Sequence, residues 1–277
     1  MSRITQRFAK LKADKRAGLV TYIMAGDPDA DVGYEILKGL PSAGADLIEL
    51  GMPFTDPMAD GPSIQVAAQR ALKAGMTVDG TFDMVRRFRR ETGDNDTPIL
   101  VMGYYNLVYQ RGVERFCKEA AAAGVDGFIL VDLPPEEADE LKPHAVANGL
   151  DTVLLTAPTT DDKRLPAVLK YSAGFVYFVS VLGITGTRSS TEEAIAAHVE
   201  RIKRHTKLPV GVGFGIRTPE QAAAVARHAD AAVVGTAIVD RVKAGLDELG
   251  KPKPGLAAGV FADVKALAAG VRGVSKA

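Results

Sequence analysis

Two carboxylates lie close together in the sequence, in a setting that suits proton transfer. Glu49 stands within the apolar segment "LIELGMP", and Asp60 ends a turn-rich stretch just before a predicted helix. Buried carboxylates without partners are rare, and apolar neighbours raise the carboxyl pKa toward neutrality, where proton transfer is efficient. Two such groups near one site favour a division of labour between acid and base.

Each carboxylate also has a purely structural interpretation. Glu49 could be a buried acid paired with an Arg or Lys, and Asp60, in "DGPS", could be a turn or helix-cap residue. The structural interpretation is weaker for Glu49, because the carboxyl ends of barrel strands face the catalytic mouth. The catalytic interpretation is therefore favoured for the pair.

Three glycine-containing segments indicate a phosphate site. The segments are "GITGTR" (183–188), "GFGIRTPEQ" (213–221) and "VGTAIVD" (234–240), and each follows an apolar strand pattern. Glycine lets backbone N–H groups approach an anion, and helix N-termini add a favourable dipole. TIM barrels often bind phosphate between the loops that follow the seventh and eighth strands. Tight turns alone remain an alternative for Gly183 and Gly213.

The residues missing from predicted strand ends narrow the chemistry. All four histidines (His144, His198, His205 and His228) fall in helical patterns, so no metal site is expected. No lysine ends a predicted strand, which disfavours a Schiff-base aldolase. Proton-transfer chemistry remains, in either an isomerase or a lyase. A lyase of this kind would need a substrate that supplies its own electron sink.

The elements that must position these residues alternate regularly. Eight apolar strand patterns are separated by helical patterns, which predicts a (β/α)8 TIM barrel. The predicted strands are 18–26, 46–53, 97–105, 125–132, 150–158, 173–181, 208–215 and 229–237. A doubly wound open sheet is the competing fold, but "MAGDPDADVG" after the first strand is no dinucleotide-binding fingerprint.

Two additions to the repeating unit are expected. Ile4, Phe8 and Leu11 share one helix face, which predicts an extra N-terminal helix. The long interval between the second and third strands predicts an elaborated loop at the catalytic face, and we expect another after the sixth strand.

Composition bounds the class of protein. The 277 residues include 34 basic and 34 acidic residues, which gives no indication of a nucleic-acid or membrane surface. The single cysteine, Cys117, lies in a helical pattern, and no disulfide framework is possible. No segment has transmembrane length or a signal-peptide core. We expect one domain over residues 1–277 in the cytoplasm.

Several motifs together resemble those of the tryptophan synthase alpha subunit family. They are "LIELGMPFTDPMADGPSIQ", "MGYYN", "FILVDLPPEE", "GITGTR", "GFGI" and "VVGTAIV", and the resemblance covers nearly the whole chain. It implies retro-aldol cleavage of indole-3-glycerol phosphate to indole and glyceraldehyde 3-phosphate, with protonated indole as the electron sink. The first motif is highly specific.

The resemblance also implies residue roles. Glu49 matches the general acid–base group, and Asp60 matches the acid that binds the indole N–H. Thr185 matches the lid residue that orients Asp60, and Tyr177 the tyrosine near the substrate hydroxyls. The phosphate cradle would comprise Gly186, Gly215, Gly235 and Thr236, and the indole walls Tyr22, Met102, Tyr104, Ile129 and Phe214. Tyr22 stands where the family commonly has phenylalanine.

The family resemblance further implies a partner. Its members work beside a pyridoxal-phosphate beta subunit, so we expect an α2β2 tetramer with no cofactor on this chain. Pro53, Asp56 and Pro57 match the contact segment. Two alternatives stay open: a stand-alone indole-releasing lyase, and a non-catalytic activator of a beta subunit. Intact Glu49 and Asp60 argue against the second.

Overall fold

The computed structural model of the protein describes residues 1–180, 192–213 and 215–276. Its helices are α1 (Arg3–Ala13), α2 (Ala30–Ala43), α3 (Pro62–Lys73), α4 (Val78–Thr92), α5 (Tyr105–Arg111), α6 (Val113–Ala123), η1 (Pro135–Glu137), α7 (Lys142–Ala147), α8 (Leu165–Tyr171), α9 (Glu192–His205), α10 (Pro219–His228), α11 (Thr236–Ala244) and α12 (Leu256–Arg272). Its strands are β1 (Gly18–Met24), β2 (Leu47–Gly51), β3 (Ile99–Gly103), β4 (Gly127–Leu130), β5 (Asp151–Thr152), β6 (Leu155–Thr156), β7 (Val176–Val179), β8 (Val210–Gly213) and β9 (Ala231–Val234).

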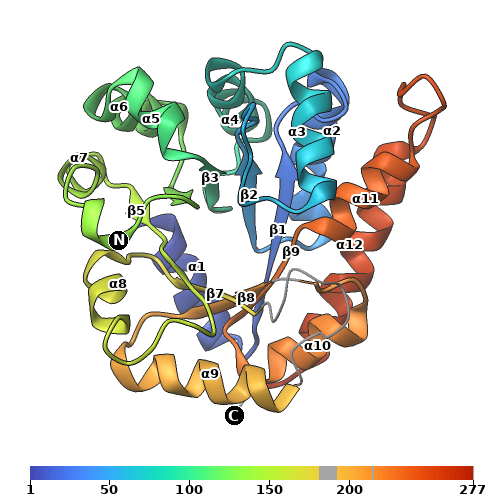
Figure 1. The fold of residues 1–277 in the computed structure, drawn as a ribbon. Coiled ribbons are helices and arrows are strands. Elements are labelled where there is room, and N and C mark those ends of the chain that lie inside the picture. Colours follow the sequence, from blue (N-terminus) through green and yellow to red (C-terminus); the bar gives the residue numbers. More distant parts are fainter. Residues whose placement is uncertain (181–191, 214, 277) are drawn as a thin grey trace.

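The strands form one parallel sheet in the order β5-β4-β3-β2-β1-β9-β8-β7-β6, with helices around it (Figure 1). The two end strands, β5 and β6, are consecutive in the chain. Between them the Val153 N–H donates to the Phe128 carbonyl at 2.9 Å, and the Leu154 carbonyl accepts the Tyr177 N–H at 3.2 Å. The predicted fifth strand is thus interrupted but still joins both neighbours, and the predicted (β/α)8 barrel is confirmed.

Alternation along each strand separates two apolar layers. Ile48 and Leu50 of β2 face the outer layer, where the helices pack on the sheet, whereas Leu47 belongs to the barrel interior. Buried Cys117 on α6 lies in the outer layer, as a helix residue was predicted to do. Because the side chains of a strand alternate, Glu49 must face the interior with Leu47.

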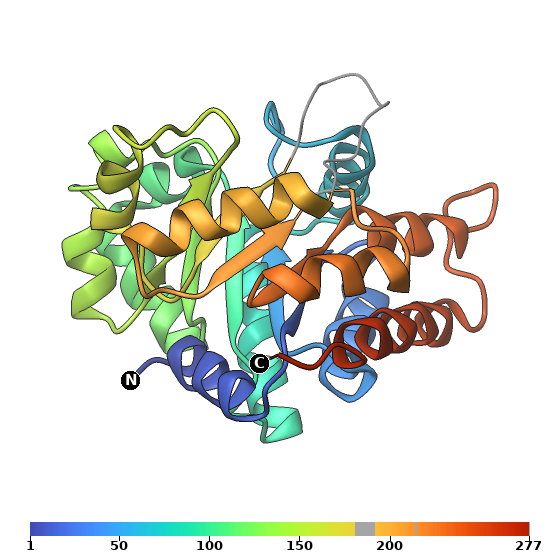
Figure 2. The same cartoon turned by 90° about the horizontal axis from the view of Figure 1, so that it is seen from below.

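Helix α1 closes the amino-terminal end of the barrel, as Figure 2 shows from below. Its buried residues are Ile4, Phe8 and Leu11, the same three that predicted it. The Phe8 ring lies 5.6 Å from the ring of Phe175 inside the barrel. The extra N-terminal helix is therefore confirmed as a plug that leaves only the opposite end of the barrel open.

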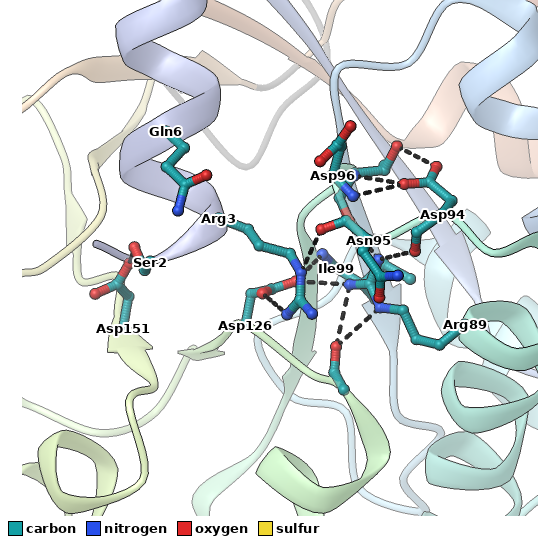
Figure 3. A network of polar contacts seen from close by, with 12 residues as sticks. Ser2, Arg3, Gln6, Arg89, Asp94, Asn95, Asp96, Ile99, Asp126 and Asp151 are labelled. Carbon is teal, nitrogen blue, oxygen red and sulfur yellow. Dashed lines mark hydrogen bonds and ion pairs between the residues drawn. The ribbon is translucent and has the colours of Figure 1, made fainter.

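Buried aspartates at this closed end join neighbouring strands. Asp46 and Asp126 stand immediately before β2 and β4, and their carboxylates accept the backbone N–H groups of Leu19 (3.0 Å) and Ile99 (2.8 Å). Asp126 also forms ion pairs with Arg3 and Arg89, each at 2.8 Å (Figure 3). Every charge in this network has a hydrogen-bonded partner, so burial of the carboxylates is offset.

The interval after β2 is elaborated mainly by an additional helix. A loop over residues 52–61 leads into α3, and α4 follows before the chain enters β3. The predicted elaborated loop is thus present but short, and the extra length is helical. The segment predicted as elaborated after the sixth strand falls in 181–191, outside the described residues.

Candidate active site

A cavity of about 210 Å³ lies at the open, carboxyl-terminal end of the strands. Its lining combines two carboxylates, two tyrosines, several apolar side chains and a glycine-rich side. The lining residues are Tyr22, Glu49, Ala59, Asp60, Gly61, Ile64, Met102, Val131, Leu155, Tyr177, Val179, Gly215, Ile216, Val233, Gly235 and Thr236. An apolar cavity with a few convergent polar groups is the usual form of a small-molecule site.

Glu49 is the third of the five residues of β2, and only Gly51 follows it on the interior face. The side chain is 1% exposed, and among the described residues its Oε1 atom has no hydrogen-bond partner. Burial raises the carboxyl pKa of Glu49 from 4.5 to about 8. A group with this pKa can both donate and accept a proton near neutral pH.

Glycines make room for the two tyrosines beside Glu49. Tyr22 on β1 is in register with Glu49, and a Cβ atom on Gly51 would come within 2.2 Å of its hydroxyl oxygen. Tyr177 on β7 would similarly collide with a Cβ on Gly213, at 2.4 Å. Burial and the nearby Glu49 charge both raise the pKa of the Tyr177 hydroxyl, so the hydroxyl stays protonated.

Asp60 is not the cap of the helix that follows it. The N-cap of α3 is Gly61, and it makes no side-chain cap hydrogen bond. The loop around Asp60 is held from outside: the Ala59 N–H donates to the Tyr104 hydroxyl at 2.9 Å, and Gln65 Nε2 donates to the Asp60 carbonyl at 2.9 Å. This arrangement leaves the Asp60 carboxylate facing the cavity.

The pKa of Asp60 is set by two opposing influences. Burial raises it from 3.8 to about 6, while a hydrogen bond from the Tyr104 hydroxyl partly opposes that rise. Burial and the Asp60 charge raise the pKa of Tyr104 to about 12. Near neutral pH, Asp60 is therefore mostly ionised whereas Glu49 is mostly protonated, the separation expected of an acid and a base with different tasks.

The glycine-rich side of the cavity offers backbone donors. Gly235 is the N-cap of α11, with no side-chain cap hydrogen bond and no acid in the first turn. A side chain at this position would crowd Tyr22, because a Cβ would lie 3.2 Å from Cβ of Tyr22. Gly215 has a left-handed backbone with φ +75°. Free N–H groups and the helix dipole suit a phosphate here.

The structure brings most of the predicted site residues together, but not all. Met102 lines the cavity, as predicted for an indole wall, and Tyr104 lies behind Asp60. Ile129 is fully buried in the barrel interior and does not line the cavity; Val131, two residues further along, does. Thr185, Gly186 and Phe214 lie outside the described residues.

Sequence reasoning missed several apolar lining residues. They are Ile64, Val131, Leu155, Val179, Ile216 and Val233. Alternation could have found Val131 and Val179, which face inward near strand ends. No local signal distinguishes Ile64, because it lies on α3 and reaches the cavity only through the fold.

The segment predicted to contact a partner lies at the rim of the cavity. Asp56 is exposed and Pro57 partly so, whereas Pro53 is buried within this chain. Neighbouring Met58 is 80% exposed, although it is apolar. The Phe54 ring packs 5.2 Å from the Tyr104 ring, and this contact joins the segment to the residue that binds Asp60.

Comparisons with known proteins agree with one another. Residues 8–258 match the sequence model of the family described as "Tryptophan synthase alpha chain". The chain is 55% identical to the tryptophan synthase alpha chain of Acidiphilium cryptum, with complete coverage of both chains. It superposes with a TM-score of 0.90 on tryptophan synthase subunit alpha from Legionella pneumophila, at 38% identity over 99% of this chain and 100% of that one. A chain of tryptophan synthase from M. tuberculosis gives 0.85, at 35% identity over 98% and 99%.

Proposed function

Because the chain belongs to the tryptophan synthase alpha chain family, we propose that Glu49 and Asp60 carry out the reaction of that family in the cavity described above. The protein is a lyase of tryptophan biosynthesis that cleaves indole-3-glycerol phosphate to indole and glyceraldehyde 3-phosphate. One observation carries the residue assignment: two carboxyl groups with pKa values of about 8 and about 6 face one cavity.

Glu49 is the proton donor and acceptor in this proposal. Its protonated carboxyl transfers a proton to the indole carbon that bears the glycerol chain, which makes the ring an electron sink. The resulting carboxylate accepts the proton of the adjacent hydroxyl as the carbon–carbon bond breaks and its electron pair returns to the ring. The raised pKa of Glu49 suits both steps, since the carboxyl is mostly protonated near neutral pH and can still lose and regain its proton there.

Asp60 supplies the opposing charge. Its carboxylate accepts a hydrogen bond from the indole N–H and stabilises the positive charge that develops there. Tyr104 orients this group through a hydrogen bond, and the Ala59 N–H fixes the tyrosine in turn. A charge held in place before the reaction needs no reorganisation during it, and this is the main source of electrostatic catalysis.

The remaining lining residues offer a different kind of contact to each part of the substrate. Met102, Val131 and Ile64 offer apolar contacts to an indole ring, and Tyr177 offers a hydroxyl to the glycerol chain. Gly215, Gly235 and Thr236 would receive the phosphate at the start of α11. The family resemblance implies two further site residues outside the described residues: Thr185, which would orient Asp60, and Gly186, which would belong to the phosphate cradle.

We further propose that the partner is a pyridoxal-phosphate-dependent beta subunit in an α2β2 tetramer, contacted through Asp56 and Pro57. Their place in an exposed loop at the rim supports this, since a partner can reach Asp56 and Pro57 there. Residues 1–277 would form one domain, since α1 and α12 both pack on the barrel. As a biosynthetic enzyme of this family, the protein would act in the cytoplasm. None of the described helices is long and apolar enough to cross a membrane.

Indole release from indole-3-glycerol phosphate, measured with and without a beta subunit, tests the proposal. We expect slow release alone and faster release in the complex. A substrate analogue that lacks phosphate should bind poorly. Unchanged release on addition of a beta subunit would favour the stand-alone lyase, and no release under either condition would favour a docking protein.

A further inference from the structure

A second, larger cavity lies at the opposite end of the barrel, remote from Glu49. It encloses about 540 Å³. Its lining comes from the end of α1, the end of α9, the start of β8 and the C-terminal segment. The lining residues are Phe8, Leu11, Lys12, Lys15, Arg16, Lys203, Thr206, Lys207, Leu208, Pro209, Asp230 and Lys276. We call this cavity the basal cleft.

The basal cleft is strongly basic. Six of its twelve lining residues are Lys or Arg and one is an acid, although the whole chain has no net charge. Like charges repel, so cations gathered around one cavity destabilise the protein to the extent that nearby acids or a bound anion do not compensate them. Such a concentration in a concave site also focuses the electrostatic field on the ligand.

Part of this charge is already neutralised. Arg16 pairs with buried Asp46 at 2.7 Å, and Lys203 and Lys276 share Asp230 at 2.9 and 3.6 Å. Lys12, Lys15 and Lys207 form no ion pair among the described residues, and all three are exposed. The uncompensated charge is therefore carried by three ammonium groups, two from the end of α1 and one from the segment after α9.

Backbone contacts join the parts of the chain that carry these exposed lysines. The Lys276 N–H donates to the Lys15 carbonyl at 2.9 Å, so the C-terminal segment is bound to the residues that follow α1. Figure 2 shows the C-terminus beside the last turn of this helix. Leu208 and Pro209, both half-buried, add apolar surface to the lining, whereas Phe8 and Leu11 are almost fully buried. The walls thus come from four separate parts of the chain (8–16, 203–209, 230 and 276), and a ligand would bridge them.

We propose that the basal cleft binds a small phosphorylated anion that carries an apolar or aromatic portion. The volume is within the range of small-molecule sites. Three free ammonium groups suit a phosphate or diphosphate, while the apolar lining suits a planar ring. Helix dipoles explain lysines in the last turns of α1 and α9, but Lys15 and Lys207 lie beyond those helices, so the dipoles do not account for them.

Titration of the whole protein with ADP and with pyrophosphate, followed by calorimetry at low salt, tests this proposal. We expect saturable binding of both, tighter for ADP, that weakens as salt rises. The double variant Lys12→Glu with Lys207→Glu should weaken ADP binding about tenfold or more, because each reversal replaces an attraction by a repulsion. Lys73→Glu with Lys265→Glu is the matched control, since it makes the same charge change at exposed sites outside the cleft.

The active site contains a second candidate anion site, so its contribution must be separated. Gly235→Val would block the proposed phosphate cradle and should leave ADP binding to the basal cleft intact. ADP binding lost in Gly235→Val but unchanged in the Lys12 and Lys207 double variant would overturn the proposal, as would no binding at low salt. Indole release by the double variant should equal that of the unaltered protein, which also confirms that it folds.

Discussion

Buried carboxylates at the two ends of the barrel differ in their hydrogen-bond partners. At the closed end, Asp126 is 4% exposed and is held by Arg3, Arg89 and a backbone N–H. At the open end, Glu49 is 1% exposed, and its Oε1 has no hydrogen-bond partner among the described residues. Both residues are buried, so the main difference lies in their partners, and it distinguishes a structural charge from a candidate for proton transfer.

The sharpest test of this comparison is Glu49→Gln. Glutamine keeps the shape of the side chain but cannot transfer a proton, so indole release should fall by about 10²–10⁴-fold, and more if one group serves both steps. Steady-state kinetics with indole-3-glycerol phosphate measure the loss, and calorimetric binding of glycerol phosphate checks that the cavity is intact. Near-normal turnover would remove Glu49 from the mechanism.

The same comparison predicts opposite effects on stability. Asp126→Asn breaks a buried ion-pair network and should lower the free energy of unfolding by about 3–5 kcal/mol. Glu49→Gln should raise it near pH 8. The folded pKa of Glu49 is about 8 against 4.5 in the unfolded chain, so the folded state binds the extra proton and stability falls as pH rises between these values.

Urea unfolding at two pH values measures both effects. The advantage of Glu49→Gln over the unaltered protein should be on the order of 2–4 kcal/mol near pH 8, and it should vanish below the unfolded pKa, where both states are protonated. If Glu49→Gln were destabilising at pH 8, Glu49 would have to be an ionised, paired group like Asp126, and the comparison between the two ends would fail.

Asp60→Asn should reduce cleavage by about 10²–10³-fold, because a neutral amide stabilises the cationic indole less well than a carboxylate. The pH profile sharpens this prediction. With Asp60 ionised above pH about 6 and Glu49 protonated below about 8, kcat/KM should be bell-shaped, with limbs at those values. Asn as active as Asp would show that the charge at this position is unnecessary.

The glycine-rich side should respond through binding. Gly235→Val places atoms against Tyr22 and should weaken glycerol phosphate binding by about tenfold or more, since backbone donors can no longer approach the anion. Gly215→Val should act by a different route: no atom of the described residues lies within 4 Å of its added Cβ, so strain at φ +75° is the cause. Unaltered calorimetric affinity in both variants would place the phosphate elsewhere.

The smallest effect is expected at the rim. Asp56→Ala should reduce stimulation by a beta subunit by about fivefold or more, within the usual range of coupling between sites, while basal indole release changes little. Asp56 is exposed and its loop reaches Asp60 through Tyr104, so contact here can influence the site without taking part in chemistry. Lost basal activity with normal stimulation would instead assign the loop to the chemistry.

The sequence by itself determined the repeating architecture and predicted which two carboxylates are the candidate reacting groups. Strand and helix periodicity predicted the barrel and α1, because apolar spacing directly records which faces are buried. It could not show that the fifth strand breaks into β5 and β6, since the apolar run 153–155 continues across the break. Glu49 was recognisable because an acid within an apolar strand is unusual.

Tertiary structure alone decided the environment of these two carboxyl groups, and therefore their pKa values. The pKa values of Glu49 and Asp60 depend on burial by distant elements and on the Tyr104 hydroxyl, and the sequence near either residue reveals neither cause. It also decided that Ile129 lies beneath the cavity, that Ile64 reaches it from a helix, and that lysines far apart in the chain share the basal cleft. Local sequence encodes which faces are buried, whereas electrostatic environment is a property of the packed whole.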